Sequence, residues 1–211
     1  MLDIFFPALL GVIFAQASPG PNFLAVASIA LSQGRRYALL VAAGVATGVC
    51  IWALSFVAGL SKVFNDYPDV ALVLRFAGGG YLLYVAVKAI YSAYKGIPSS
   101  IRHSSLKLSQ RAAYMRGLLV VLTNPKAAMM WAAVSAYLLG SGLSTIAVLI
   151  FAPIASLTAL AIYGAYGLLF SSRKAQKIYF RTSRIFEMIF GLAFGTLGSK
   201  LLIDGIKEIR P

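Results

Sequence analysis

Three stretches of this sequence contain no charged side chain and are each long enough to cross a lipid bilayer. They are residues 4–34, 37–61 and 127–172. A membrane-spanning helix needs about 20 apolar residues, so the third stretch is too long for one helix. Gly140-Ser141-Gly142 interrupts it, which predicts two helices joined by a tight hairpin. Only 12% of the residues are charged, whereas soluble domains carry about 25%, so the chain lacks the surface of a water-soluble fold.

Two further apolar segments bring the expected number of membrane helices to six. Residues 69–94 form the third helix and residues 184–206 form the sixth. Arg75 lies near the start of the third helix and Lys88 near its end. The N-terminus has no basic region and no cleavage site before Pro19, so the first stretch is expected to be a helix rather than a signal peptide. The predicted fold class is therefore an all-α integral membrane protein with six transmembrane helices.

Lysine and arginine residues collect in alternate connections between the expected helices. The first, third and fifth connections hold twelve of them, while the second and fourth hold only Lys62. Because basic loops of membrane proteins stay in the cytoplasm, these three connections are expected inside and both chain ends outside. The loops account for the formal charge of +13, so the expected partner is a lipid bilayer and not nucleic acid.

An internal repeat is expected from the division of the chain. The polar and basic loop of residues 96–115 separates a first half, residues 1–95, from a second half, residues 116–211. A shift of 112 positions aligns the two halves at Gly79 with Gly191, Lys88 with Lys200, and Lys95 with Lys207. Since each half has three expected helices, an odd number, equivalent halves would be inverted in the membrane. Two inverted three-helix repeats are typical of secondary transporters, whose sites lie near the membrane midplane.

Proline-centred motifs interrupt the first helix of each half. The two motifs are Ser18-Pro19-Gly20-Pro21-Asn22 and Asn124-Pro125-Lys126. Proline removes a backbone donor, and glycine tolerates conformations that other residues avoid, so helices one and four are predicted to be broken. The freed backbone groups need partners inside a membrane, and the N-terminus of a half-helix favours a carboxylate. The alternative is a kink that serves only helix packing.

The candidate substrate-binding residues surround these breaks. They are Gln16, Ser18, Pro19, Gly20, Pro21, Asn22, Asn124, Pro125 and Lys126. A lysine inside the membrane costs about 2.5–3.5 kcal/mol on insertion scales, which favours a functional role for Lys126 as a carboxylate ligand or in proton transfer. The alternative is a lysine that snorkels to the interface. Glu187 is the second proton-coupling candidate, and its alternative is an ion pair with a loop arginine.

Other residues are assigned to packing or excluded from chemistry. Gly44 and Gly48 share one helix face and are expected to allow close helix packing. His103 and Cys50 are the only histidine and cysteine, which leaves no metal cluster, disulfide or Ser–His pair. Glu187 and Asp204 are expected near opposite faces, so they do not form an aspartyl protease site. We therefore expect no enzyme activity, no metal and no cofactor. A passive channel or a membrane scaffold remains an alternative.

Four motifs together resemble the lysine/threonine exporter family (LysE/RhtB), and the resemblance spans nearly the whole chain. They are Ser18-Pro19-Gly20-Pro21, Gly34-Arg35-Arg36, Gly44-Val45-Ala46-Thr47-Gly48 and Asn124-Pro125-Lys126-Ala127. The resemblance implies proton-driven export of amino acids or their derivatives across the bacterial inner membrane. Members of that family export lysine or arginine, or threonine, homoserine, leucine and related neutral compounds. The scarcity of buried carboxylates favours a neutral substrate, with a basic one as the alternative. A homodimer is an open possibility.

Overall fold

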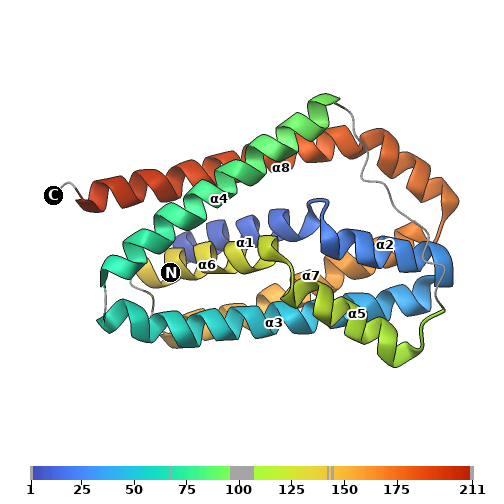
Figure 1. Ribbon diagram of the computed structural model, residues 1–211, viewed down its shortest axis with the longest axis horizontal. Helices are drawn as coiled ribbons and strands as arrows, with labels where there is room; N and C mark the ends of the chain where they lie inside the picture. The colour runs from blue at the N-terminus through green and yellow to red at the C-terminus, as the bar shows by residue number, and fades with distance from the viewer. Residues whose placement is uncertain (1, 67, 96–106, 142, 144, 210–211) are drawn as a thin grey trace.

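The computed structural model describes residues 2–66, 68–95, 107–141, 143 and 145–209, and this part of the chain is helical (Figure 1). Eight helices follow one another along it. They are α1 (Leu2–Ala17), α2 (Pro21–Gln33), α3 (Arg35–Asp66), α4 (Pro68–Lys95), α5 (Gln110–Leu122), α6 (Pro125–Gly140), α7 (Thr145–Phe170) and α8 (Arg173–Ile209). His103 and most of the basic central loop lie outside the described residues.

Both predicted helix breaks are present. The helix axis bends by 47° between α1 and α2 and by 58° between α5 and α6. Each bent pair is apolar and long enough to form one broken span, and α3, α7 and α8 each contain a candidate span of their own. By length and composition the described residues thus hold up to five spans. The third expected helix exists as α4 but is not among these spans, so a six-span architecture stays a prediction.

Helix α8 differs most from the sequence-based expectation. It begins at Arg173, whereas the sixth helix was predicted to begin near residue 184. The prediction treated the basic cluster at residues 173–184 as a loop because charged side chains do not enter the hydrocarbon region. Lysine and arginine are nevertheless good helix formers, so a helix continues through such a segment once it leaves the membrane.

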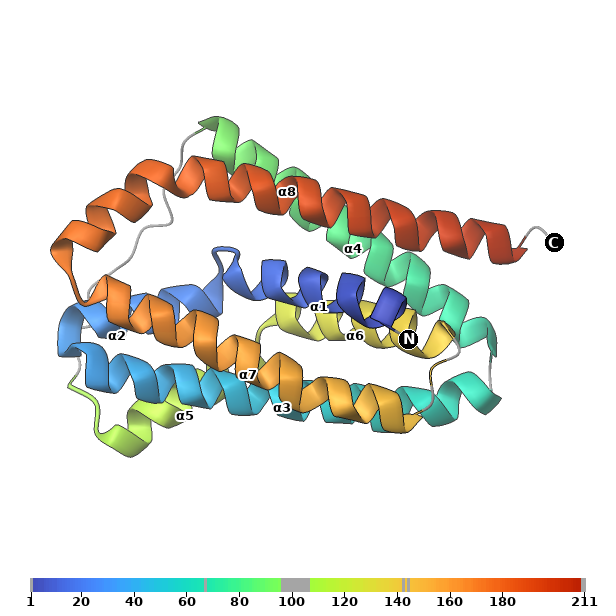
Figure 2. The same ribbon diagram turned by 180° about the vertical axis from the view of Figure 1, so that it is seen from behind.

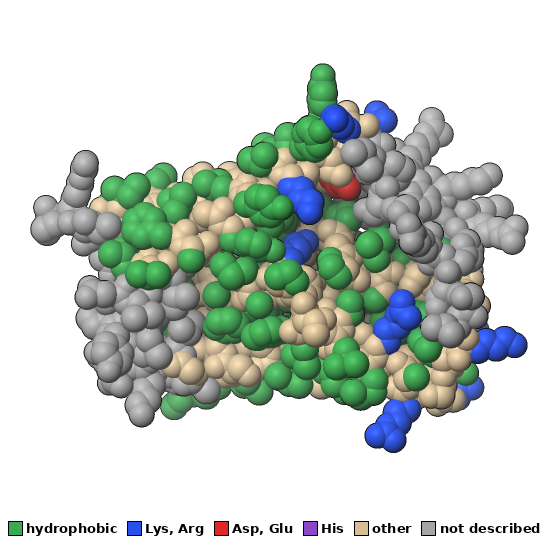
Figure 3. Space-filling view, in the orientation of Figure 1, with side chains coloured by type: hydrophobic (Ala, Val, Ile, Leu, Met, Phe, Trp, Pro, Cys, Tyr) green, Lys and Arg blue, Asp and Glu red, His purple; other side chains and the backbone are tan. Residues whose placement is uncertain are grey.

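The helices form two groups that face each other. Figures 1 and 2 show α4 and α8 side by side along one side of the molecule, with the remaining helices on the other side. Within that second group α3 packs between α5 and α7. The ends of α2 and α7 and the start of α5 lie at one end of the bundle, and both chain termini lie toward the other (Figure 1). Hydrophobic side chains cover much of the surface in between (Figure 3).

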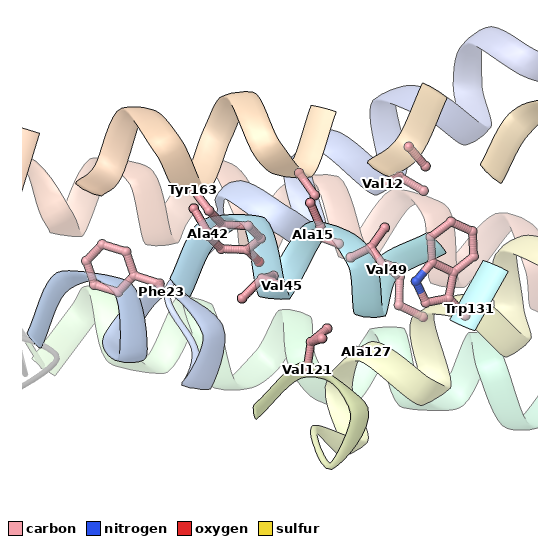
Figure 4. Packing of buried hydrophobic residues seen from close by; sticks show 14 of the residues in the cluster. Val12, Ala15, Phe23, Ala42, Val45, Val49, Val121, Ala127, Trp131 and Tyr163 are labelled. Atoms are coloured by element: carbon pink, nitrogen blue, oxygen red, sulfur yellow. The ribbon is translucent and has the colours of Figure 1, made fainter. Parts of the chain in front are cut away.

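The second group is held together by close contact between backbones. A Cβ atom added to Gly44 on α3 would lie 2.0 Å from the carbonyl oxygen of Tyr114 on α5. A Cβ atom on Gly117 of α5 would lie 1.9 Å from the carbonyl oxygen of Val41. Lipid provides no hydrophobic drive for helix association, so small residues that let backbones touch are the main means of packing. Figure 4 shows small and medium-sized side chains, such as Val45, filling the core beside this crossing.

Candidate functional site

The break between α1 and α2 is stabilised by hydrogen bonds within the protein. Where α1 ends, the backbone N–H of Ser18 donates to Phe14 (2.9 Å) and its hydroxyl donates to the carbonyl of Ala15 (3.2 Å). The hydroxyl of Tyr166 on α7 donates to the carbonyl of Ala17 over 2.6 Å. These carbonyls therefore have protein partners, as backbone groups freed inside a membrane require.

The break between α5 and α6 is organised by Asn124. Its side-chain oxygen accepts a hydrogen bond from the backbone N–H of Lys126 (3.0 Å), so Asn124 caps α6 while Pro125 occupies the first helical position. Both are preferred arrangements at a helix start. On the other side of the break, the indole N–H of Trp52 donates to the carbonyl of Val121 over 3.0 Å.

Side chains connect the two breaks directly, although they lie about 100 residues apart in sequence. The amide nitrogen of Asn124 donates to the side-chain oxygen of Asn22 over 3.1 Å. The ammonium group of Lys126 donates to the hydroxyl of Ser18. Asn22 in turn contacts the hydroxyl of Tyr163 on α7 (3.3 Å). The breaks thus form one polar unit inside an apolar bundle.

A cavity of about 370 Å³ lies beside this unit and extends to α4 and α8. We call it the central cavity. Its lining consists of Ser18, Pro19, Gly20, Pro21, Leu24, Tyr81, Tyr84, Val85, Lys88, Ala89, Ser92, Asn124, Pro125, Lys126, Glu187, Phe190 and Phe194. The N-termini of α2 and α6 both border it, so the positive ends of two helix dipoles face the same space.

The central cavity contains charges of both signs. Lys88 and Lys126 contribute ammonium groups, and Glu187 contributes a carboxylate. Only 6% of Glu187 is exposed, and the hydroxyl of Ser92 on α4 forms a hydrogen bond with it. The ammonium nitrogen of Lys126 lies 5.5 Å from the centre of the Phe194 ring, a cation–π contact. The lining of the central cavity therefore includes both basic and acidic side chains.

Two candidate residues do not line the central cavity. Gln16 and Asn22 line an adjoining polar pocket of about 20 Å³, which is large enough for a single water molecule and shares Ser18, Gly20, Asn124 and Lys126 with the central cavity. The amide of Gln16 donates to the carbonyl of Ala155 (2.9 Å) and accepts from the hydroxyl of Thr158 (3.0 Å), which ties α1 to α7. The indole N–H of Trp131, at the wall of this pocket, is the one buried side-chain nitrogen or oxygen without a partner among the described residues.

Apart from Glu187, sequence reasoning missed the part of the central cavity that α4 and α8 provide. The missed lining residues include Tyr81, Tyr84, Lys88, Ser92 and Phe194. They belong to no local motif and come together only because two helices pack across the breaks. One signal did exist, since a lysine such as Lys88 near an apolar helix end is costly unless it faces a polar space.

The link between the breaks can be tested with Asn124→Asp. The carboxylate still caps α6, but it no longer donates to Asn22 and places two acceptor oxygens together. An unmade buried hydrogen bond costs about 1–3 kcal/mol of stability, so the protein should still fold but unfold at a lower temperature. Thermal unfolding of the detergent-solubilised variants would measure this loss. Asn124→Ser, which keeps a cap and a donor, should lose less, and equal Tm values for the two variants would contradict this role.

Known proteins resemble this chain over nearly its whole length. The chain matches the family model of the LysE type translocators over residues 13–205. Threonine efflux proteins of Salmonella typhi and Escherichia coli K12 are 27% and 26% identical to it, over 97% of this chain and 100% of each relative. A leucine efflux protein of Salmonella choleraesuis is 31% identical over 56% of this chain and 55% of its own length. No solved structure matches the chain.

Proposed function

Since this chain belongs to the LysE type translocator family, we propose that it exports a neutral amino acid across the bacterial inner membrane in exchange for protons. The observation that carries the proposal is the convergence of Lys126, Glu187 and two half-helix N-termini on one cavity. At about 370 Å³ the central cavity falls within the usual range of about 300–1,000 Å³ for small-molecule sites.

The proposed binding mode follows the charges of the cavity. The substrate carboxylate binds the ammonium group of Lys126 and the N-termini of α2 and α6, where helix dipoles favour negative charge. The substrate ammonium group faces Glu187. Ser18, Pro19, Gly20, Pro21, Asn124 and Pro125 shape this end of the cavity. Gln16 and Asn22 hold the breaks in place from behind and do not touch the substrate.

The preference for a neutral substrate rests on the charge balance. The described lining of the central cavity contains two lysines, Lys88 and Lys126, and one acid, Glu187. Once the carboxylate and ammonium groups of an amino acid are paired, one lysine remains, and it repels a cationic side chain. The names of the related threonine and leucine efflux proteins agree with this preference. Lysine and arginine are therefore the disfavoured substrates.

Proton coupling is proposed to use the same charges. Lys126 and Glu187 are the candidates, because a charged group that loses its partner in a closed cavity favours its neutral form. The proposed topology has six spans, with both chain ends outside and the basic connections in the cytoplasm. Residues 1–95 and 116–211 then form the inverted repeats on either side of residues 96–115, a basic segment whose last residues belong to α5. A homodimer in the membrane is compatible with this arrangement.

Exchange in proteoliposomes tests the substrate class. Vesicles that hold the purified chain are preloaded with one unlabelled amino acid, and entry of labelled threonine is measured. Threonine and leucine inside should stimulate entry at least tenfold more than lysine or arginine, which corresponds to about 1.4 kcal/mol of discrimination. Stimulation by lysine equal to that by threonine would contradict the neutral-substrate proposal.

A further inference from the structure

A second cavity, of about 50 Å³, lies between α1, α6 and the α4–α8 pair, on the side of the breaks toward the chain termini. We call it the apolar cavity. Its lining is hydrophobic except at Tyr137 and Lys200, and the ammonium group of Lys200 lies 5.4 Å from the centre of the Tyr137 ring. Phe194 lines both this cavity and the central cavity, with 1% of its surface exposed. Phe194 is thus the residue that the described linings of the two cavities share.

The residues of α4 and α8 that line the two cavities correspond through the 112-residue shift. On α4, Val85, Lys88 and Ala89 line the central cavity. The residues 112 positions later are Leu197, Lys200 and Leu201, and all three line the apolar cavity. The correspondence includes an unusual residue type, a lysine in an apolar helix, in each set. If the two halves are inverted repeats, the rotation that relates them therefore places one cavity on the position of the other.

The contact between α4 and α8 obeys the same shift. A Cβ atom on Gly79 of α4 would lie 3.1 Å from the carbonyl oxygen of Gly198 on α8. A Cβ atom on Gly191 of α8 would lie 3.1 Å from the carbonyl oxygen of Ala86 on α4. Gly191 and Gly198 lie 112 positions after Gly79 and Ala86. The two helices therefore pack as a symmetric pair, with small residues that bring their backbones close along the contact.

We infer that the apolar cavity is the outward half of the substrate path in its closed form, and that the α4–α8 pair moves as one body to open it while it closes the central cavity. This inference rests on the proposed export function. The substrate leaves the central cavity past Phe194, and Lys200 lines its outward path as Lys88 lines the central cavity on the inner side. Alternating exposure of one site by rigid-body movement of one repeat or helix bundle against another is the general behaviour of inverted-repeat transporters.

Thiol labelling tests the opening without any measurement of transport. In a Cys50→Ala background, Leu197→Cys places a thiol in the apolar cavity, and Leu192→Cys places one on the outer surface of the same helix. A charged thiol reagent added outside intact cells reaches water-filled space but not hydrocarbon. The Leu197→Cys thiol should be labelled at least about tenfold faster than the Leu192→Cys thiol. Equal or slower labelling of Leu197→Cys would overturn the inference.

Cross-linking tests whether the opening is needed for export. A Cβ atom on Gly11 of α1 would lie 2.9 Å from Leu197, so Gly11→Cys with Leu197→Cys joins α1 to α8 across the apolar cavity. The control pair, Leu72→Cys with Gly205→Cys, joins α4 to α8 inside the moving body, where a Cβ atom on Gly205 would lie 3.7 Å from Leu72. A short thiol cross-linker should abolish export in the first pair, reversibly on reduction, and spare it in the second.

The outcomes separate this inference from the proposed function. Full export by the cross-linked Gly11→Cys and Leu197→Cys protein would overturn the outward path, although amino acid export itself would stand. Rapid labelling of Leu197→Cys in a protein that moves no amino acid would support the outward path and reject only the proposed substrate.

Discussion

Lys126→Met is expected to abolish amino acid export and to leave the protein folded in the membrane. The ammonium group of Lys126 lines the central cavity, donates to Ser18 and is the cation next to the N-termini of α2 and α6. Truncation of one partner of a buried charge pair costs about 2–5 kcal/mol, so export should fall by at least roughly 30-fold. Methionine keeps much of the length of the side chain and removes a charge that is costly inside a membrane, so folding should not suffer.

Export from proteoliposomes and the size-exclusion profile of the detergent-solubilised protein would measure the two effects. The matched control is Lys95→Met. Lys95 is exposed at the end of α4, where its ammonium group lies 4.9 Å from the ring centre of Tyr91, outside the central cavity. This control should export at the wild-type rate. Normal export by Lys126→Met would show that export does not need this ammonium group and would remove the proposed carboxylate site.

The second large effect is expected at the crossing of α3 and α5. Gly117→Ala would bring a methyl group to 1.9 Å from the carbonyl oxygen of Val41, and Gly44→Ala would bring one to 2.0 Å from that of Tyr114. Both obstacles are backbone atoms, so the two helices must separate. Overpacking usually costs about 1–3 kcal/mol of stability, and each of these two variants should lose about 3 kcal/mol or more.

Thermal unfolding of the detergent-solubilised variants would measure this loss. For a chain of this size, a loss of about 3 kcal/mol corresponds to a decrease in Tm of roughly 6–12 °C. Gly80→Ala is the control, because a Cβ atom there meets no atom within 4 Å and alanine favours the helix. A Tm of Gly117→Ala close to that of Gly80→Ala would contradict the backbone contact between α3 and α5.

The helix breaks could be predicted from sequence because their cause is local. Proline at positions 19, 21 and 125 removes backbone donors regardless of how the helices pack. The structure has a bend at each of the two motifs. The cost of a charge in a membrane singled out Lys126 for a similar reason. Lys126 does lie on the central cavity, between the two breaks.

The remainder of the site depends on packing between distant helices, which no local pattern encodes. Gln16 and Asn22 stand beside the first break in sequence, yet both line the small polar pocket, and Gln16 contacts α7. Glu187 was singled out as a rare acid, but its partner Ser92 on α4 carries no signal of its own. Phe194 resembles any other apolar helix residue. Its position between two cavities follows only from the approach of α8 to α1 and α6.

The proposed internal repeat was only partly recognisable from the sequence. The 112-residue shift rests on few identities in the sequence, among them Gly79 with Gly191 and Lys88 with Lys200. The shift gains a structural meaning when the aligned residues are located in the structure, because Lys88 and Lys200 line different cavities.

Proton-driven accumulation in proteoliposomes tests the central claim most directly. Vesicles that contain the wild-type chain receive labelled threonine at equal concentration on both sides, and a pH gradient is then imposed. The account predicts that threonine moves to one side against its own gradient, that a protonophore abolishes this accumulation, and that Lys126→Met vesicles show none. Threonine that remains at equal concentrations under the pH gradient, in vesicles shown to contain folded protein, would contradict a proton-coupled exporter of neutral amino acids.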